Sequence, residues 1–449
     1  SQNRDMNSRA YLLSLGCAKN LVDSESILDI LRELEYDVVE EVTPDVRLDL
    51  AVVNTCGFIQ EAKQESIDVI LQLAKLKESG QVKYIIAAGC LGQRYQQELI
   101  EQLPEVDAFL GTGNIPQLKQ IIKDLGTGQQ KSNFKNPGFL RIKPKGERSL
   151  TPGHWAYVKI AEGCNNRCHY CVIPDLRGPY RSCPLESVVE EVKALAEKGI
   201  AEVNLISQDT GYYGYDLRGK SLLPDLLKSL EEIKSLKWIR LLYTHPAHVT
   251  DELIKQIAQS QKICPYIDLP LQHINDNILQ SMGRKVTKQQ ILDLIVKLRS
   301  SIPGLSIRTT FIVGLPGEGD KEFQELLGFI RATGFERLGA FMYSQEEGTP
   351  AADYKNQVSE KVKQKRFDEV MALQQDIARE LNSRLMGKTI PVLIDEKDTR
   401  PGWFIGRTQA DAPEVDGQIF VEVKDAVPGQ ILEVEITDTY EYDLVGREV

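Results

Sequence analysis

The chain has 449 residues, 42% of them hydrophobic and 27% charged, which is typical of a soluble globular protein and too long for one ordinary domain. No apolar run reaches the roughly 20 residues of a membrane span, and the first apolar run is too short for a secretory signal, so we expect a cytoplasmic protein without a membrane partner. The net charge of −11 argues against a general nucleic-acid binder, which usually has a basic face.

The N-terminal segment, residues 8–125, alternates strand and helix patterns. Three apolar runs, each followed by a helical pattern, are typical of buried parallel strands: AYLLSLGC, LDLAVVNTC and VKYIIAAGC. We expect the first helix to begin at Asp23. This pattern predicts an open parallel α/β sheet. The runs end in Cys17, Cys56 and Cys90, and sites in such sheets form outside the carboxyl ends of the strands, so the three thiols can converge.

The middle of the chain predicts a second α/β domain after a linker. Residues 126–149 are polar and rich in Gly, Lys and Pro, which indicates the linker. Strand and helix patterns then alternate six times over residues 150–380, which predicts a partial (β/α)6 barrel rather than the full eight units. The expected strands are AYVKIAEGC, EVNLISQD, WIRLLYTHP, YIDLPLQH, SIRTTFIVGLPGE and RLGAFMYSQE.

The C-terminal segment, residues 383–449, changes to short β patterns after a long helix expected from about Ser359 to Leu385. These patterns predict a small β-barrel. They are KTIPVLIDE, WFIGRT, GQIFVEV and GQILEVEITDTYEYDLVG.

The stretch EGCNNRCHYC holds three cysteines with the spacing C-x3-C-x2-C: Cys164, Cys168 and Cys171. Three thiolates can hold three irons of a four-iron cluster, and the fourth iron is then open to a ligand that is not protein. An open metal position implies chemistry, as it does for zinc. The alternative is a zinc loop completed by His169 or a distant residue, although His169 is poorly placed to share a metal with Cys168.

The three cysteines at the N-terminal strand ends are a second candidate set. Each could be a core thiol, since free cysteine is often buried. Gly or Asn stands beside each of them, in SLGCAKN, VVNTCGF and AAGCLGQR, which favours a cofactor because glycine lets backbone approach it closely. Cys183 and Cys264 match neither set, and we interpret them as incidental thiols.

The motif C-x3-C-x-aromatic-C after the first barrel strand resembles that of the radical S-adenosylmethionine enzymes, with Tyr170 as the aromatic residue. The resemblance implies a 4Fe–4S cluster whose open iron binds S-adenosylmethionine and cleaves it to a 5′-deoxyadenosyl radical. SQD, residues 207–209, replaces the Gly-Gly-Glu that is common in that family, and GLPGE, residues 314–318, is also compatible with a plain turn. The expected cofactor-binding residues are Tyr170, Gln208, Asp209, Arg308, Thr309, Gly314 and Glu318. No catalytic acid or base can be assigned.

Both cysteine sets together resemble those of the methylthiotransferases. That family joins an N-terminal cluster-binding domain, a radical barrel and a C-terminal TRAM domain. The resemblance implies a second 4Fe–4S cluster, which has an open iron that carries the sulfur or methylthio group. Its ligands would be Cys17, Cys56 and Cys90, and those of the first cluster Cys164, Cys168 and Cys171.

Within that family, SLGCAKNLVDSE and NTCGFIQEAKQESID resemble the branch that modifies a ribosomal protein more than the tRNA branch, although Ala18 departs from a common proline. Residues 379–449 hold eight Lys or Arg and 15 Asp or Glu, a net charge of −7. An acidic domain suits a basic ribosomal protein, whereas tRNA binding needs positive charge. An ordinary solvated surface can have the same charge.

We therefore expect an enzyme that inserts a methylthio group at the β-carbon of an aspartate in a basic small-subunit ribosomal protein. Two 4Fe–4S clusters and S-adenosylmethionine would be its cofactors, an electron donor such as flavodoxin or ferredoxin would reduce it, and tRNA would not be its substrate. The alternatives are a tRNA adenosine methylthiotransferase, a non-catalytic iron–sulfur carrier and an RNA-binding protein with a zinc loop.

Overall fold

A computed structural model describes residues 8–127, 131–134 and 150–449. The chain forms two units, which are described separately. The first comprises Ser1–Leu150, Glu162–Asn165 and Cys171–Arg181. The second comprises Thr151–Ala161, Asn166–Tyr170 and Ser182–Val449. Two-residue strands, β8 (Ala161–Glu162) and β9 (Arg181–Ser182), lie where the chain passes from one unit to the other.

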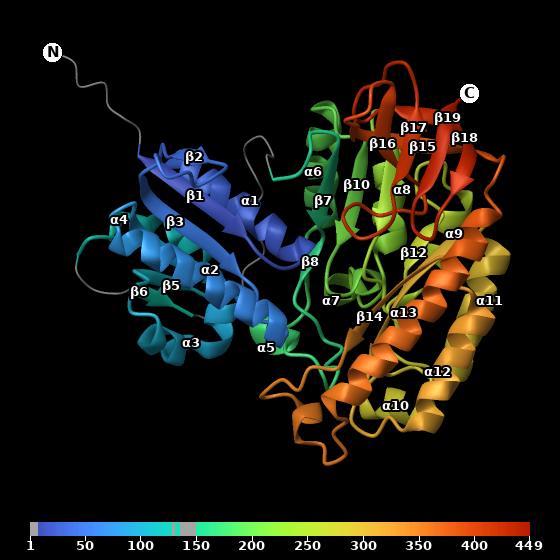
Figure 1. Ribbon diagram of the computed structural model, residues 1–449, viewed down its shortest axis with the longest axis horizontal. Helices are drawn as coiled ribbons and strands as arrows, with labels where there is room; N and C mark the ends of the chain where they lie inside the picture. The colour runs from blue at the N-terminus through green and yellow to red at the C-terminus, as the bar shows by residue number, and fades with distance from the viewer. Residues whose placement is uncertain (1–7, 128–130, 135–149) are drawn as a thin grey trace. The chain divides into compact units, whose positions relative to one another are not determined.

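The first unit contains a parallel sheet of six strands in the order β2-β1-β3-β4-β5-β6. The three expected strands are its centre, because their continuous apolar runs can be buried on both faces. The strands are β1 (Arg9–Ser14), β2 (Asp37–Val39), β3 (Leu48–Thr55), β4 (Val82–Gly89), β5 (Ala108–Leu110) and β6 (Lys131–Asn133) (Figure 1).

Helices cover both faces of this sheet. Residues of α1 (Ala18–Glu33) and α4 (Leu118–Lys123) pack in one apolar cluster with Leu50 and Val52, and residues of α2 (Gln60–Glu78) and α3 (Cys90–Gln102) pack in another with Ala51 and Val53. Successive residues of β3 thus face opposite layers, as the pleat of a strand requires. A short 3-10 turn, η1 (Ile115–Gln117), precedes α4.

Two features of this unit differ from expectation. α1 begins at Ala18, five residues before Asp23, because Cys17 has extended backbone angles and directly precedes the helix. β6 lies inside the range expected to be a linker. It pairs with β5 through parallel backbone hydrogen bonds, which an edge strand can form whatever its side chains are. The rest of that linker, residues 128–130 and 135–149, lies outside the described residues.

The second unit contains the six expected barrel strands as two parallel sheets of three, β7-β10-β11 and β12-β13-β14, joined by an isolated bridge between Ile239 and Ile263. β7 and β14 are the outer strands of this order. The strands are β7 (Trp155–Lys159), β10 (Glu202–Ile206), β11 (Trp238–Leu241), β12 (Tyr266–Asp268), β13 (Ser306–Val313) and β14 (Arg337–Met342).

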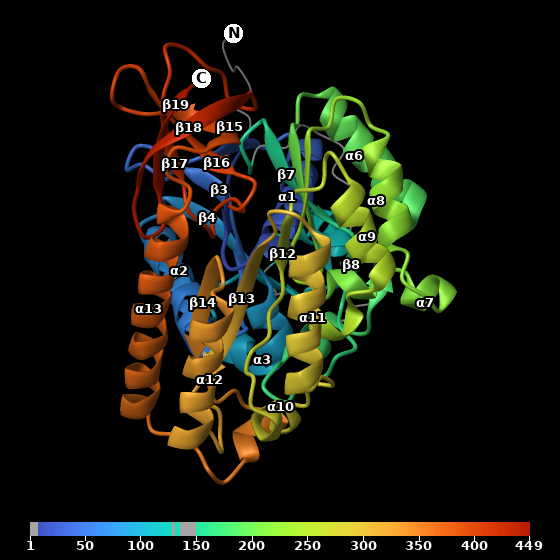
Figure 2. The same ribbon diagram turned by 90° about the vertical axis from the view of Figure 1, so that its right-hand side faces the viewer.

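The helices between these strands pack against them in one apolar core, and Figure 2 shows α9, α11, α12 and α13 along an outer side of the strands. The longer helices are α6 (Leu185–Glu197), α8 (Leu223–Glu231), α9 (Asp251–Gln259), α11 (Lys288–Ser301), α12 (Asp320–Thr333) and α13 (Glu360–Ser383). The short elements are α7 (Tyr215–Arg218), α10 (Asp276–Ser281), η2 (Thr210–Tyr212), η3 (Pro246–His248) and η4 (Pro350–Asp353). Among the described residues, no helix is long and apolar enough to cross a membrane.

The C-terminal residues form a closed five-stranded barrel in the order β15-β16-β17-β19-β18, as expected. Its inward residues make a separate apolar core. The strands are β15 (Thr389–Lys397), β16 (Trp403–Thr408), β17 (Ile419–Glu422), β18 (Ile431–Thr439) and β19 (Leu444–Glu448). The helix before it, α13, begins after Ser359, whose hydroxyl accepts a hydrogen bond from the Val362 N–H.

Buried ion pairs attach this C-terminal barrel to the partial barrel. Arg407 on β16 donates to Glu202 at the start of β10, with two N···O distances of 3.0 Å, and also to Asp395 on β15. Arg240 on β11 lies 3.3 Å from Glu202, whose side chain is fully buried. Each charge in this group is paired, which is the condition under which buried charges are tolerated.

A second group of ion pairs joins β13 and β14 to the loop that follows β16. Arg308 Nη1 lies 2.7 Å from Asp416, and Arg337 Nη2 lies 2.6 Å from Asp411. The Tyr266 hydroxyl donates to Asp416 at 2.7 Å. All these partial-barrel residues lie in the first half of their strands, so the C-terminal barrel attaches to the amino ends of the strands.

Candidate metal centres and cofactor site

Cys17, Cys56 and Cys90 lie at the carboxyl ends of β1, β3 and β4, which are neighbours in the sheet. The parallel register aligns these ends, because Ser14 of β1 pairs with Asn54 of β3 and Asn54 with Ala88 of β4. The three thiols interact electrostatically with one another. The three strand ends that carry these cysteines therefore lie side by side, and the role of the cysteines as cluster ligands stays a prediction.

Glycines make the space in which these thiols meet. Gly16 has a φ of +87°, and a Cβ there would lie 2.9 Å from Cys56 Cβ and 3.0 Å from its sulfur. A Cβ on Gly57 would lie 3.0 Å from the carbonyl of Cys90. The Gly16 position therefore requires glycine, and Gly57 is tightly packed against Cys90. Thiolates are ligands that bind iron–sulfur clusters, so the chemistry of these three cysteines fits such a group.

The three thiols differ in acidity. Desolvation by the surrounding protein would raise the pKa of Cys17, but Lys19, Arg177 and two backbone N–H groups outweigh it and hold that pKa below its ordinary value. This fits the position of Cys17 at the start of α1, since a helix N-terminus stabilises a thiolate. Burial, together with the neighbouring thiols, raises the pKa of Cys56 to about 11 and also raises that of Cys90.

Arg177, the last residue of α5 (Ile173–Arg177), lies among these thiols and was not anticipated from the sequence. Its Nη1 lies 3.0 Å from Asp23 and 3.4 Å from Glu162, and its Nη2 lies 3.8 Å from the Cys90 sulfur. Burial alone would lower the pKa of Arg177, but Cys90, Cys17 and the two carboxylates raise it well above its ordinary value. Arg177 therefore places a positive charge among these groups, because the arginine side chain is always charged.

A buried polar network supports the strand ends that carry these cysteines. The Asn54 amide donates to the Asn20 carbonyl and to the Ser24 hydroxyl, each at 2.9 Å. The Asn20 amide donates to the Leu15 carbonyl at 2.6 Å. Satisfied buried networks make a unique arrangement rigid. Asn20 and Asp23 belong to the quoted motif SLGCAKNLVDSE, which is the signal that could have identified them.

The second cysteine set lies in a contiguous loop after β8. In the first unit, the Cys164 N–H donates to the Gly178 carbonyl at 3.1 Å. In the second unit, Arg284 Nη1 lies 3.8 Å from the Cys168 sulfur. Cys164, Cys168 and Cys171 are each partly exposed. A thiol beside a guanidinium fits a metal-bound thiolate, because N–H groups close to sulfur stabilise its negative charge.

His169 is tied to its surroundings through backbone and side chain. Its Nδ1 lies 3.0 Å from the Ser281 carbonyl and 2.6 Å from the Tyr354 hydroxyl. Its ring packs on Gly283, where a Cβ would lie 2.6 Å from the imidazole. One ring nitrogen is thus engaged with protein. Among the described residues, no group of three or more His, Cys, Asp or Glu side chains is arranged to hold a single metal ion.

Asp209, an expected contact of S-adenosylmethionine, lies just after β10 and is almost completely buried. Its carboxylate accepts from Asn166 Nδ2 at 2.9 Å and lies 2.6 Å from His248 Nδ1. Burial would raise the pKa of Asp209, but His248, His245 and Asn166 together lower it. Burial and Arg284 lower the pKa of His245 to about 3. A carboxylate at a strand end thus lies beside the cysteine loop, which supplies Asn166.

Gly314 and Glu318 form a turn with a buried ion cluster. The Gly314 N–H donates to Glu318 at 2.8 Å, and a Cβ on Gly314 would clash with Lys363. The same carboxylate lies 2.7 Å from His273 Nε2 and 2.9 Å from Arg366 Nη1. Both carboxylate oxygens of Glu318 therefore already have protein partners.

The other expected cofactor contacts have separate surroundings. Tyr170 packs against a small apolar cluster that includes Met282, and Gln208 is half-buried beside Asp209. The Thr309 hydroxyl donates to the Leu269 carbonyl at 2.9 Å, and Arg308 pairs with Asp416 as described above. Thr309 thus contacts a residue of the partial barrel, and Arg308 contacts a residue of the C-terminal barrel.

The remaining cysteines, Cys183 and Cys264, are buried.

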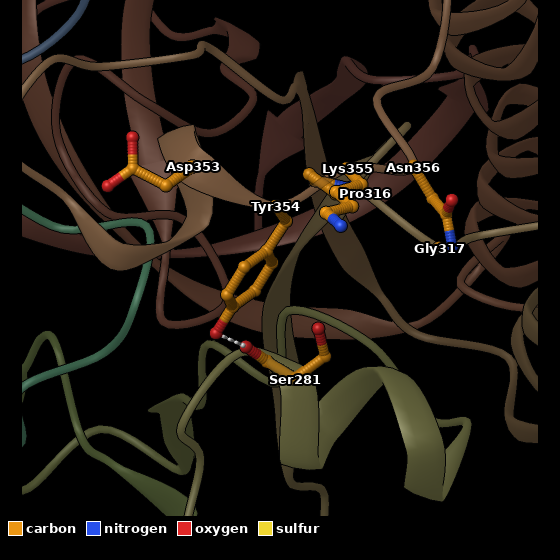
Figure 3. Close-up of a pocket in the computed structure, with 7 residues that line it drawn as sticks. All are labelled: Ser281, Pro316, Gly317, Asp353, Tyr354, Lys355 and Asn356. Carbon is orange, nitrogen blue, oxygen red and sulfur yellow. Dashed lines mark hydrogen bonds between the residues drawn. The ribbon is translucent and has the colours of Figure 1, made fainter.

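A separate open pocket of about 410 Å³ lies beside the GLPGE turn, and Figure 3 shows the Tyr354 hydroxyl in it, directed at the Ser281 carbonyl. This hydrogen bond measures 3.1 Å. The pocket contains none of the expected cofactor contacts. Its lining residues are Ser281, Pro316, Gly317, Asp353, Tyr354, Lys355 and Asn356.

Three family models match successive parts of the chain. The uncharacterized protein family UPF0004 matches residues 9–111, the radical SAM superfamily matches residues 158–330, and the TRAM domain matches residues 386–449. Among solved structures, the radical S-adenosylmethionine methyltransferase TsrM of Kitasatospora setae has a TM-score of 0.55 at 16% identity, covering 88% of this chain and 80% of that chain. That similarity establishes the fold of a radical S-adenosylmethionine enzyme.

Curated relatives match over almost the whole length. Proteins named ribosomal protein uS12 methylthiotransferase RimO are 44% identical in Lachnoclostridium phytofermentans, over 98% of this chain and 99% of the relative, and 47% identical in Desulforamulus reducens, over 97% and 98%. The chain belongs to this RimO family of radical S-adenosylmethionine methylthiotransferases. The resemblance of the cysteine motifs to those of the methylthiotransferases is thus confirmed.

Proposed function

We propose that this protein inserts a methylthio group at the β-carbon of an aspartate in ribosomal protein uS12. Near-full-length similarity to proteins named as uS12 methylthiotransferases supports the substrate. The observation that carries the chemistry is the position of three cysteines at the carboxyl ends of neighbouring strands, in addition to the C-x3-C-x2-C loop. Two separate sets of three thiols suit an enzyme that both generates a radical and supplies sulfur.

The two thiol sets would hold the two clusters. Cys164, Cys168 and Cys171 would bind a 4Fe–4S cluster that, with S-adenosylmethionine, supplies a 5′-deoxyadenosyl radical for hydrogen abstraction. Cys17, Cys56 and Cys90 would bind the cluster that supplies the sulfur. The protein's own contribution is to orient and hold these ligands: Gly16 leaves space for them, and Arg284 lies beside Cys168.

Asp209, Gln208, Tyr170 and Gly314 are the proposed contacts of S-adenosylmethionine. Asp209 is a pre-oriented acceptor for the methionyl amine, because Asn166 and His248 hold its carboxylate in one position. Arg308, Thr309 and Glu318 were expected at the same site. Their present partners support a different proposal for Arg308 and Glu318, namely that they stabilise the strands that carry the site.

The expected domain limits are 8–125, 150–380 and 383–449, and the three family matches fall within them. Because β6 pairs with β5, we propose that the first domain extends to β6 and that the linker follows it. An acidic C-terminal domain favours a basic ribosomal protein over tRNA, because phosphate neutralisation supplies most tRNA affinity.

A small one-electron donor such as flavodoxin or ferredoxin would reduce the radical-generating site. Since the substrate is a ribosomal protein, the proposed location is the cytoplasm.

Iron stoichiometry tests the two-cluster proposal. The chain is reconstituted anaerobically with iron and sulfide, and iron is counted in wild type and in two triple variants. Wild type should hold about eight irons, and Cys164→Ala/Cys168→Ala/Cys171→Ala should hold about four. The matched variant Cys17→Ala/Cys56→Ala/Cys90→Ala should also hold about four. A wild type that holds only four irons would contradict the proposal.

Substrate choice is tested by competition. The reconstituted enzyme is incubated with S-adenosylmethionine, a reductant, and equal amounts of small ribosomal subunit and tRNA, followed by mass analysis of both. A methylthio mass gain should appear on uS12 at an aspartate. A gain on tRNA alone would overturn the substrate while leaving the radical chemistry intact, and formation of no 5′-deoxyadenosine would indicate an iron–sulfur carrier.

A further inference from the structure

The guanidinium of Arg177 contacts two carboxylates through one nitrogen and the thiol of Cys90 through another. One arm of its guanidinium, Nη1, contacts the carboxylates of Asp23 and Glu162 at 3.0 and 3.4 Å. The other arm, Nη2, lies 3.8 Å from the Cys90 sulfur. Because the five N–H donors of arginine form a rigid planar fork, contacts on one arm fix the direction of the other. The sulfur of Cys90 therefore faces an oriented donor.

The surroundings of this donor are dominated by negative groups. Asp23 and Glu162 are buried and both contact Arg177, which is itself only 3% exposed. Negative charge close to an iron site opposes its reduction, because reduction adds one more electron. A buried guanidinium offsets that charge, and hydrogen bonds to cluster sulfurs, net charge and solvent exposure are what tune the potentials of such sites.

We propose that Arg177 is a positioning residue that raises the reduction potential of the iron–sulfur site held by Cys17, Cys56 and Cys90, through an N–H···S hydrogen bond to Cys90. This rests on the proposed function. In the proposed reaction, a substrate carbon radical would bond to a methylthiolate held by the cluster, and the radical and the sulfur would each contribute one electron to the new C–S bond. Breaking the iron–sulfur bond would leave one electron on the cluster. A higher potential favours that transfer, so Arg177 promotes sulfur insertion without touching the substrate.

The test uses a full-length chain in which only the N-terminal site can be loaded, namely Cys164→Ala/Cys168→Ala/Cys171→Ala. Into this background we would introduce Arg177→Gln, which removes the charge, and Arg177→Lys, which keeps the charge but not the fork. Lys77→Gln is the matched control, because Lys77 is a cation of the same unit that pairs with Asp107 at 2.6 Å. Iron content and the midpoint potential of the one-electron couple, followed by electron paramagnetic resonance, are the readouts.

Arg177→Gln should keep about four irons and shift the midpoint potential to a more negative value than in the control, and Arg177→Lys should shift it less. Either variant holding iron with the potential of Lys77→Gln would overturn the proposal. Failure of both variants to take up iron, in a chain that still folds, would also overturn it, because Arg177 would then serve assembly. Failure of the background itself to hold iron would instead refute the two-cluster function.

Discussion

Replacing Arg407 by methionine should loosen the C-terminal barrel from the partial barrel. Arg407 makes paired contacts of 2.8–3.1 Å with both Glu202 and Asp395 and is 3% exposed. Removing one partner of a buried ion pair costs about 3–5 kcal/mol. Arg240 still pairs with Glu202, and His154 lies 2.7 Å from Asp395, so the low end of that range, about 3 kcal/mol, applies here.

Trp155 is a built-in reporter of this loss, because its ring centre lies 6.0 Å from the Arg407 guanidinium and it is buried. Its fluorescence should shift to longer wavelength when the interface opens. With a denaturant slope of about 2 kcal/mol per molar urea, the transition midpoint should fall by roughly 1.5 M. The control, Arg447→Met, removes an exposed pair with Glu435 and should cost less than about 1 kcal/mol.

The pH dependence supplies an independent check of the same interface. Despite burial, Arg407 and its neighbours hold the pKa values of Glu202 and Asp395 below their ordinary range. A carboxyl with a lowered folded-state pKa stabilises the fold above its unfolded pKa of about 4, and this contribution disappears as the pH falls through the folded value. The difference between wild type and Arg407→Met should therefore shrink in acid. Equal midpoints for Arg407→Met and Arg447→Met at neutral pH would refute the reasoning.

Three further outcomes are expected. Asp209→Asn should weaken S-adenosylmethionine binding by on the order of tenfold, because charge-assisted hydrogen bonds are about twice as strong as neutral ones. Calorimetry on the reconstituted enzyme measures this affinity. An unchanged affinity would show that Asp209 does not contact S-adenosylmethionine. His245→Gln should flatten the loss of stability between pH 6.5 and 3, because the folded-state pKa of His245 is lowered to about 3 and protonation below 6.5 favours unfolding. In the iron-free chain, iodoacetamide should label Cys17 well before Cys264. Cys17 is exposed and has a lowered pKa, whereas burial raises the pKa of Cys264 to about 11. Mass spectrometry that finds the opposite order of labelling would contradict both assignments.

The parallel order of the strands explains why the neighbouring positions of the three cysteine-bearing strand ends could be predicted. Cys17, Cys56 and Cys90 are far apart in sequence, but each ends a long apolar run, and neighbouring parallel strands bring such ends to one edge. Arg177 could not be found in this way. It is 154 residues from its partner Asp23 and ends a five-residue helix, which is too short to have a periodic pattern.

Position along a strand is the other limit of the sequence pattern. Arg308 lies in the third residue of β13, so it faces the amino end and pairs with Asp416 there, whereas Gly314 follows the last residue of the same strand. The two-residue repeat of a strand predicts the face of the sheet to which a side chain points. It does not predict which end of the barrel the side chain lies near. The three-residue strands β2, β5 and β6 are likewise too short for a detectable period.

The attachment of the C-terminal barrel to the amino ends of the partial-barrel strands separates two kinds of evolutionary constraint. Residues such as Arg407 and Asp416 are committed to buried ion pairs, so a change on one side requires a matching change on the other. Glu422 and Glu433, on the outside of the same small barrel, are exposed. The outer charges can therefore change, and with them the choice of macromolecular partner, without a change at Asp209 and Glu318, which follow the opposite, carboxyl ends of their strands.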